Sequence, residues 1–341
     1  MNYKKNKLKN CLLISLGAYG RNNLITNGKD FKNEISRHYE NLEIISSDKY
    51  IRRPRLIRIF NYLKDIFFNL VDLKKKDLFI HMNTQMALPI IISPFNRINK
   101  IITWYSHKDV PKNAKFVLNN SDLVLTASPE VFSIYPSKSL FIHSIVLPNN
   151  ADICRCKLQK QSKRDLVFLG RFSRVKRLDL FVEVALEAAN LGLIDGVRIM
   201  ANSHEKDIEL MVKNKLINCK VPVEITVNGQ LKDIYSFFQP GDIYFNAQDK
   251  CGIGKAMLEA CAIGIEVIVA CNQLQEIVKT ISDRTIYGKV EVKKVISILK
   301  NVLELNIEES ISQSQKRINS ASKLTVENLV FKSISDVYSA R

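Results

Sequence analysis

The chain has 341 residues, enough for two domains, and its 46% hydrophobic and 25% charged residues are ordinary for a globular protein. Its net charge is +17, and residues 1–150 hold 23 basic against 11 acidic residues. This excess indicates an anionic partner, which could be phospholipid, nucleic acid or a phosphorylated substrate. Seven scattered cysteines without a Cys-x-x-Cys pair favour reduced thiols, and neither they nor the five scattered histidines have metal-site spacing.

The N-terminus begins like a signal peptide, with a basic stretch followed by apolar residues. The apolar part, from Cys11 to Leu16, is too short for one and is interrupted by Gly17. We therefore expect a basic tail followed by a first strand. Because no run reaches 18 apolar residues, no transmembrane helix is predicted.

Short apolar, β-branched runs then alternate with longer helical patterns along the chain. In the first half the predicted strands are 11–16, 42–46, 77–81, 100–105 and 122–128. In the second half they are 165–170, 197–201, 223–229, 242–247 and 265–270, with helices such as 179–191, 205–216 and 254–263. This alternation predicts an α/β chain with two Rossmann-like, doubly wound parallel-sheet domains facing each other across a cleft. Ligands of such sheets bind beyond the carboxyl ends of the strands.

The domain boundaries follow from the interruptions of this pattern. The first domain is predicted at 1–150, a polar linker at 151–164 and the second domain at 165–320. Residues 321–341 are expected to form a C-terminal helix that could pack back on the first domain. Residues 54–73 place apolar side chains at helical spacing among arginines, so this segment is either a helix packed on its own sheet or a basic surface helix that contacts anionic lipid.

The segment LGRFSRVKR (169–177) is the first candidate binding site. Gly170 ends a predicted strand, and Arg171 and Lys176 follow in one short loop, together with Arg174 and Arg177. A glycine allows close approach of the backbone to a ligand, and Arg and Lys can bind phosphate oxygens. The segment is therefore either a diphosphate site or a solvated basic turn.

The segment DKCGIGKAMLEA (249–260) is the second candidate. Gly252, Ile253 and Gly254 lead into a predicted helix, and the amides at a helix N-terminus bind phosphate well. Glu259 lies about one and a half turns into that helix among small apolar residues. A buried carboxylate needs hydrogen-bond donors. These could come from the two hydroxyls of a ribose, or from a backbone group or a nearby lysine.

Together the two segments resemble the donor domain of the retaining glycosyltransferases of family 4, the "group 1" family with the two-domain GT-B fold. The resemblance implies that Arg171 and Lys176 bind the donor diphosphate. It also implies that Glu259, in GIGKAMLEACAIGIEVIVA (252–270), binds the nucleotide ribose. The matching region covers roughly residues 165–300. The resemblance further implies a nucleotide-sugar donor, retention of the anomeric configuration and no metal cofactor.

The first half resembles the family more loosely. WYSHKD (104–109) is similar to a strand-end segment whose histidine faces the reaction centre, which implies that role for His107 unless it is a buried or surface histidine. SLGAYGR (15–21) occupies the position of a loop on the substrate side, so Gly17 and Tyr19 are acceptor-side candidates unless the loop is a plain β–α turn. LPNNADI (147–153) is similar to the crossing into the second domain.

Three positions depart from the family pattern. Cys251 stands eight residues before Glu259, where the family has an acidic residue that contacts the donor sugar, and Asp249 is the nearby carboxylate that could replace it. The family's glycine pair after the strand at 197–201 is replaced by ANSHEKD (201–207). Glu266 stands where a proline is common.

The expected function is transfer of a sugar from a nucleotide sugar to a lipid-linked or growing surface glycan. The expected location is cytoplasmic, at the inner face of the membrane and in contact with anionic lipid. The alternative is a non-catalytic relative that serves as a partner in a glycan-assembly complex. Nucleic-acid binding has no motif in the chain, and the catalytic groups of a sugar-nucleotide epimerase cannot be placed in it.

Overall fold

The chain forms two compact units, which we describe separately: Met1–Val146 together with Leu329–Arg341, and Leu147–Asn328. The structure is a computed structural model. It describes residues 8–15, 39–46, 64, 78–81, 88, 91–92, 100–105, 109–141, 164–229, 234–248, 254–270, 275–282, 284–286 and 288–324. All but Arg164 of the predicted linker 151–164 and most of the predicted C-terminal helix 321–341 lie outside these ranges, as does all but Lys64 of the basic segment 54–73, so these stay predictions.

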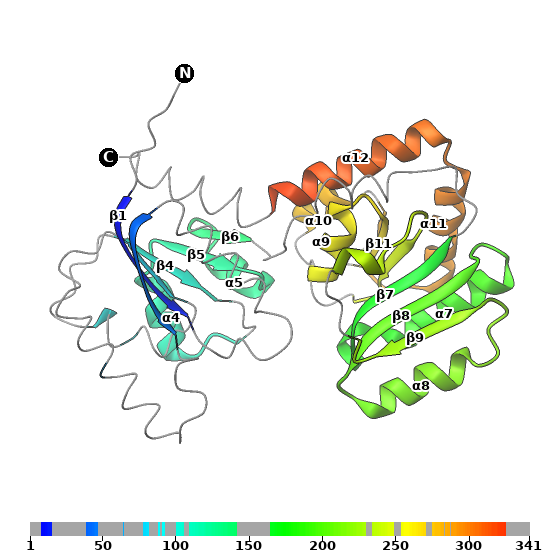
Figure 1. Cartoon of the computed structure of the whole chain (residues 1–341), viewed down its shortest axis with the longest axis horizontal. Coiled ribbons are helices and arrows are strands. Elements are labelled where there is room, and N and C mark those ends of the chain that lie inside the picture. The colour runs from blue at the N-terminus through cyan, green and yellow to red at the C-terminus, as the bar shows by residue number, and fades with distance from the viewer. Residues whose placement is uncertain are drawn as a thin grey trace. The chain divides into compact units, whose positions relative to one another are not determined.

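The first unit is built on a six-stranded parallel sheet (Figure 1). Its strands have the spatial order β2-β1-β3-β4-β5-β6. Their bounds are β1 Leu8–Ser15, β2 Tyr39–Ser46, β3 Leu78–His81, β4 Lys100–Trp104, β5 Leu123–Thr126 and β6 Ser139–Phe141. Two described helices, α4 (Lys112–Asn119) and α5 (Pro129–Ile134), follow β4 and β5. Because β1 lies between β2 and β3, the strand order reverses beside β1.

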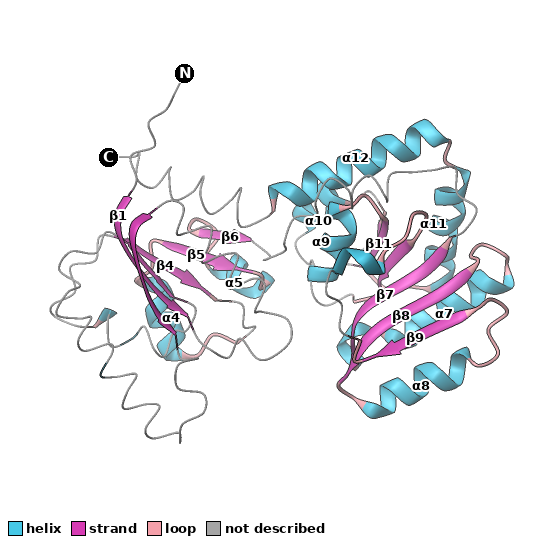
Figure 2. Cartoon of the chain, in the orientation of Figure 1, coloured by secondary structure: helices cyan, strands magenta, loops and turns pink. Residues whose placement is uncertain are grey.

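The second unit is also built on a six-stranded parallel sheet, with the strand order β12-β11-β10-β7-β8-β9 (Figure 2). The strands are β7 Asp165–Phe172, β8 Gly196–Ser203, β9 Val223–Val227, β10 Ile243–Asn246, β11 Glu266–Ala270 and β12 Thr285–Ile286. The helices are α7 Leu178–Asn190, α8 Lys206–Leu216, α9 Lys255–Ala262, α10 Gln275–Ile281, α11 Val292–Glu304 and α12 Ile307–Lys323, with short 3₁₀ turns η3 at Arg174–Lys176 and η4 at Ile234–Phe237.

Helices cover both faces of the second sheet. Alternate strand residues such as Phe168, Ile199 and Phe245 join α7, α8 and α11 in one buried cluster. Residues of the other parity, such as Val167, are also buried, and on that side α12 packs on α9 and α10. A parallel sheet buried on both faces needs apolar side chains at nearly every position, which is why its strands read as continuous apolar runs.

All ten predicted strands are present, and the edge strands β6 and β12 are additional. Several strand ends differ from the predicted ones by up to three residues. One of these differences bears on the candidate site: β7 does not end at Gly170 but continues through Arg171 to Phe172, because Arg171 pairs with Asn202 of β8. Arg171 is therefore a strand residue. Helix α12 also runs across the boundary predicted at residue 320.

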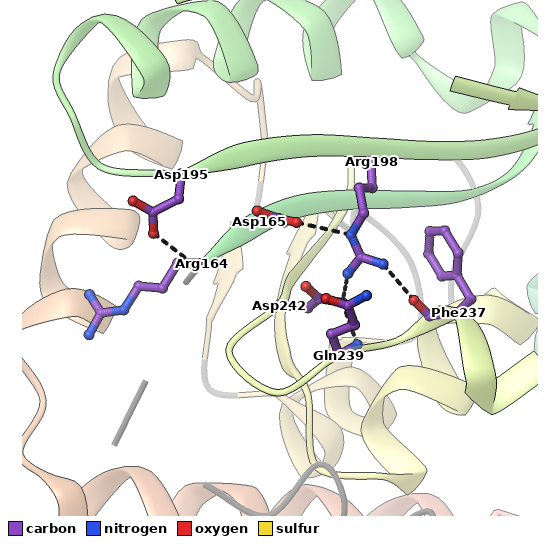
Figure 3. A network of polar contacts seen from close by, with 7 residues as sticks. All are labelled: Arg164, Asp165, Asp195, Arg198, Phe237, Gln239 and Asp242. Atoms are coloured by element: carbon purple, nitrogen blue, oxygen red, sulfur yellow. Dashed lines mark hydrogen bonds and ion pairs between the residues drawn. The ribbon is translucent and has the colours of Figure 1, made fainter. Parts of the chain in front are cut away.

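At the amino-terminal edge of the second sheet a buried arginine ties several strands together (Figure 3). Arg198 of β8 donates from Nε to Asp165 Oδ2 at 3.0 Å and from Nη1 to the Phe237 carbonyl at 2.7 Å. Its Nη2 donates to Asp242, whose carboxylate also accepts from the Gln239 backbone at 2.7 Å. Burial raises the pKa of Asp242 to about 6, although the Arg198 charge opposes that rise.

Removing the Arg198 charge should strongly destabilise this unit. Arg198→Met leaves two buried carboxylates facing each other, so we expect the free energy of unfolding to fall by about 3–5 kcal/mol. Urea unfolding followed by circular dichroism measures this loss. Arg164→Met is the matched control, because the described bonds between Arg164 and Asp195 use only the Arg164 backbone. An unchanged midpoint in Arg198→Met would show that the network does not stabilise the sheet.

Candidate functional site

The strand order of the second unit marks one edge as the place for a ligand. The chain starts this sheet at β7, adds β8 and β9 on one side, and then returns to place β10, β11 and β12 on the other. The order therefore reverses between β7 and β10. Loops leaving the carboxyl ends of two such strands diverge, and this is where doubly wound sheets bind ligands. The two candidate segments follow these two strands.

The segment after β7 turns sharply into α7. Arg171 and Phe172 complete the strand, η3 spans Arg174–Lys176, and Arg177 adopts a left-handed conformation (φ 49°) as the N-cap of α7. A Cβ added at Gly170 would lie 3.1 Å from the Phe168 ring, so a larger residue there would require that ring to shift. This turn carries Lys176 from the end of β7 toward the end of β10.

The four cations of this segment are not equivalent, which corrects the expectation of a four-cation cradle. Arg174 Nη2 lies 2.6 Å from Asp207 Oδ2, and Arg177 Nε lies 3.3 Å from Asp179 Oδ1. Both charges are therefore offset by carboxylates of α8 and α7. By contrast, the exposed Arg171 guanidinium makes no ion pair within the described ranges. Arg171 and Lys176 remain the candidates for binding an anion.

Lys176 is joined to the loop after β10 by a hydrogen bond. Its Nζ donates to Gln248 Oε1 at 2.6 Å, across the point where the strand order reverses. Gln248 is only 6% exposed. Sequence reasoning gave this residue no role. The one signal available was its place directly after the strand at 242–247, because no motif marks a lone glutamine.

Helix α9 begins at this same edge of the sheet. Gly254 is its N-cap, makes no side-chain cap and has an extended backbone (φ −88°). A Cβ added there would meet no described atom within 4 Å. The first amides of a helix have no partner within the helix, so they can donate to a phosphate at this end of α9.

Glu259 lies inside α9 and is 4% exposed. Lys255 Nζ lies 3.5 Å from Glu259 Oε1, one turn earlier in the helix. Burial raises the pKa of the Glu259 carboxyl, and the charge and hydrogen bond of Lys255 oppose part of that rise. Burial also raises the pKa of the Tyr244 phenol in β10, and the Glu259 charge adds to that rise. The lysine that the sequence left open as a partner of Glu259 is therefore Lys255, and the ribose role stays a prediction.

The other predicted site residues lie outside the described ranges. These are Asp249, Cys251, Gly252 and Ile253 in the second unit, and Gly17, Tyr19 and His107 in the first. Their roles stay predictions. In the described part of the chain, no group of three or more His, Cys, Asp or Glu side chains could hold a metal ion. No helix there is long and apolar enough to cross a membrane.

Comparison with solved structures identifies the class of fold. HepE of Anabaena, solved with UDP and glucose, is 14% identical over 98% of this chain and 100% of that chain, with a TM-score of 0.64. Sucrose-phosphate synthase from Thermosynechococcus elongatus is 12% identical at the same coverage, with a TM-score of 0.68. The lipopolysaccharide outer core galactosyltransferase WaaB is 11% identical, also at this coverage, with a TM-score of 0.66.

These similarities confirm the predicted fold class, with two parallel-sheet α/β units as in GT-B glycosyltransferases. At such low identity they show the fold alone. No protein-family model matches the chain, and no curated protein matches its sequence.

The Lys255–Glu259 pair gives a stability prediction with a defined pH dependence. The folded pKa of Glu259 lies above its ordinary 4.5, so the native state keeps this proton longer than the unfolded state. The stability that the carboxyl contributes is complete below pH 4.5 and is lost as pH rises through its folded pKa. Lys255 limits that loss. Lys255→Met should therefore match the wild type near pH 4 and lose about 1 kcal/mol at pH 7.5, a value reduced by solvent screening of the lysine.

Urea unfolding at the two pH values measures this difference. Lys213→Met is the control, because Lys213 also pairs with a glutamate one turn away, Glu209, at 2.6 Å. That glutamate lies near the surface and its pKa is lowered by Lys213. We expect a loss of only about 0.3–0.5 kcal/mol there. An equal loss at pH 4 and pH 7.5 in Lys255→Met would contradict the electrostatic account.

Proposed function

We propose that the chain is a nucleotide-sugar-dependent glycosyltransferase. The observation that carries this proposal is the set of groups at the carboxyl edge of the second sheet. Arg171, Lys176 and the first amides of α9 can bind an anion there, and the buried Glu259 lies in the same helix. HepE, which shares the fold, was solved with UDP and with UDP-glucose.

In this proposal the donor's diphosphate is the leaving group. The bond between the anomeric carbon and the β-phosphate oxygen breaks, and negative charge develops on the departing nucleoside diphosphate. Arg171 and Lys176 stabilise that charge, and the amides at the start of α9 add to their field. Glu259 accepts hydrogen bonds from the ribose hydroxyls. The anomeric carbon bonds to an acceptor hydroxyl oxygen, and the proton of that hydroxyl passes to the departing diphosphate. The family resemblance implies that this bond forms on the same face of the sugar, with retention and without a metal.

The remaining assignments complete the proposal. His107, Gly17 and Tyr19 line the acceptor side. Asp249, or another group near Cys251, contacts the donor sugar in place of the family's acidic residue. The acceptor is a lipid-linked or growing surface glycan. The excess positive charge of residues 1–150 supports a place at the anionic inner face of the membrane.

The donor can be found by a thermal-shift screen. A ligand at 100 times its dissociation constant adds about 2.7 kcal/mol to the stability of the unit that binds it. We therefore expect one of UDP, GDP, ADP, CDP or dTDP, or a sugar nucleotide derived from it, to raise the melting temperature by several degrees. If calorimetry with the same panel detects no binding, the chain is a non-catalytic partner in glycan assembly and the proposal fails.

The site assignment predicts how two arginines three residues apart should differ. Arg171→Ala should lower kcat about 100-fold, because it removes a donor from the developing charge. Arg174→Ala should leave kcat unchanged, since that guanidinium is already paired with Glu205 and Asp207. Glu259→Ala should raise the KM for the donor. The measurement is release of nucleoside diphosphate with membrane extract as acceptor. Intact turnover in both Arg171→Ala and Glu259→Ala would refute the assignment.

A further inference from the structure

The hydrogen bond between Lys176 and Gln248 joins two segments that are far apart in sequence. Lys176 ends η3, the turn after β7, and Gln248 follows β10. These strands are neighbours, with Ile243 opposite Leu166 in the register. The 2.6 Å contact therefore bridges the two loops that leave the carboxyl edge at the point of strand reversal.

The side chains of Gln248 and Lys176 differ in burial and in conformational freedom. Gln248 is buried, whereas Lys176 is half-buried at the end of a flexible four-carbon stem. Ordering such a side chain costs rotamer entropy. Because the hydrogen bond to a buried acceptor already orders the Lys176 side chain in the folded protein, less rotamer entropy is lost when a ligand binds.

The chemical nature of the acceptor is equally informative. An amide oxygen accepts a hydrogen bond without a formal negative charge. A glutamate at this position would add such a charge beside Lys176 and repel a phosphate. Gln248 therefore orients the ammonium without weakening the positive field at the edge of the sheet.

We propose that Gln248 is a positioning residue that holds the Lys176 ammonium where it meets the diphosphate of the donor. This inference rests on the proposed function, because it assigns the support of a residue in the same site. It predicts that Gln248 affects binding of the phosphates and leaves binding of the nucleoside unchanged.

The first test removes the acceptor while keeping the side-chain volume. Gln248→Met should weaken binding of the nucleoside diphosphate selected by the thermal-shift screen about tenfold, as expected for loss of a hydrogen bond to a charged group. Binding of the corresponding nucleoside, which has no phosphate, should be unchanged. Calorimetry measures both affinities. Gln239→Met is the matched control, because Gln239 is exposed before β10, at the opposite edge of the sheet, and both affinities should be retained.

The second test asks whether Gln248 acts through Lys176. In a Lys176→Met background, Gln248→Met should change diphosphate affinity less than twofold, because the ammonium that it positions is absent. Gln248→Glu keeps an acceptor of similar shape but adds a charge. It should weaken diphosphate binding more than Gln248→Met does at pH 8, and part of the affinity should return as pH falls and the carboxylate takes up a proton.

Three results would overturn the inference. Gln248→Met could bind the diphosphate as the wild type does, it could weaken the nucleoside equally, or its effect could persist undiminished in the Lys176→Met background. The second of these would indicate a purely structural residue. Failure of the proposed function looks different, because the wild-type protein would then bind none of the nucleoside diphosphates or sugar nucleotides.

Discussion

The parallel pairing of β7 with β10 is the constraint on which the second unit depends. Because β8 lies on the far side of β7, the loops after β7 and β10 leave the sheet side by side and then diverge. Segments more than seventy residues apart thereby supply one set of groups, joined by the bond from Lys176 to Gln248. Neither loop could form this site alone. The helix that starts after β10 adds its first amides at the same edge.

The two edges of this sheet differ in how their arginine side chains are paired. At the amino-terminal edge, Arg198 is buried and its charge is balanced by Asp165 and Asp242, so the group serves stability. At the carboxyl-terminal edge, Arg171 is exposed and makes no ion pair within the described ranges. The group that accepts a hydrogen bond from Lys176 there is the uncharged amide of Gln248. An exposed guanidinium without an ion pair in the described ranges can act on a ligand. The difference between the edges supports a binding role for the second and a structural role for the first.

Much of this fold was readable from the sequence because its central strands are buried on both faces and appear as apolar runs. The edge strands β6 and β12 have three and two residues, too few to show a period. Other features depend on distant partners. Arg174 looked equivalent to Arg171 until Glu205 and Asp207 were placed beside it. The segment that positions Lys176 was foreseen, whereas its contact with Gln248 required the strand order.

Glu266 stands where a proline is common in the family, and contacts with α12 hold the turn at this position. Proline in this position would stiffen the turn between α9 and β11 by fixing its own backbone. Glu266 is instead buried and pairs with Arg317 Nη1 at 3.0 Å, while Arg317 Nη2 donates to the Gly264 carbonyl at 3.1 Å. Gly264 has φ +84°, and an added Cβ would lie 2.1 Å from Ser314 Oγ. The turn is thus held by close contact with α12, and because it ends the helix that carries Glu259, α12 helps to fix the position of that carboxylate.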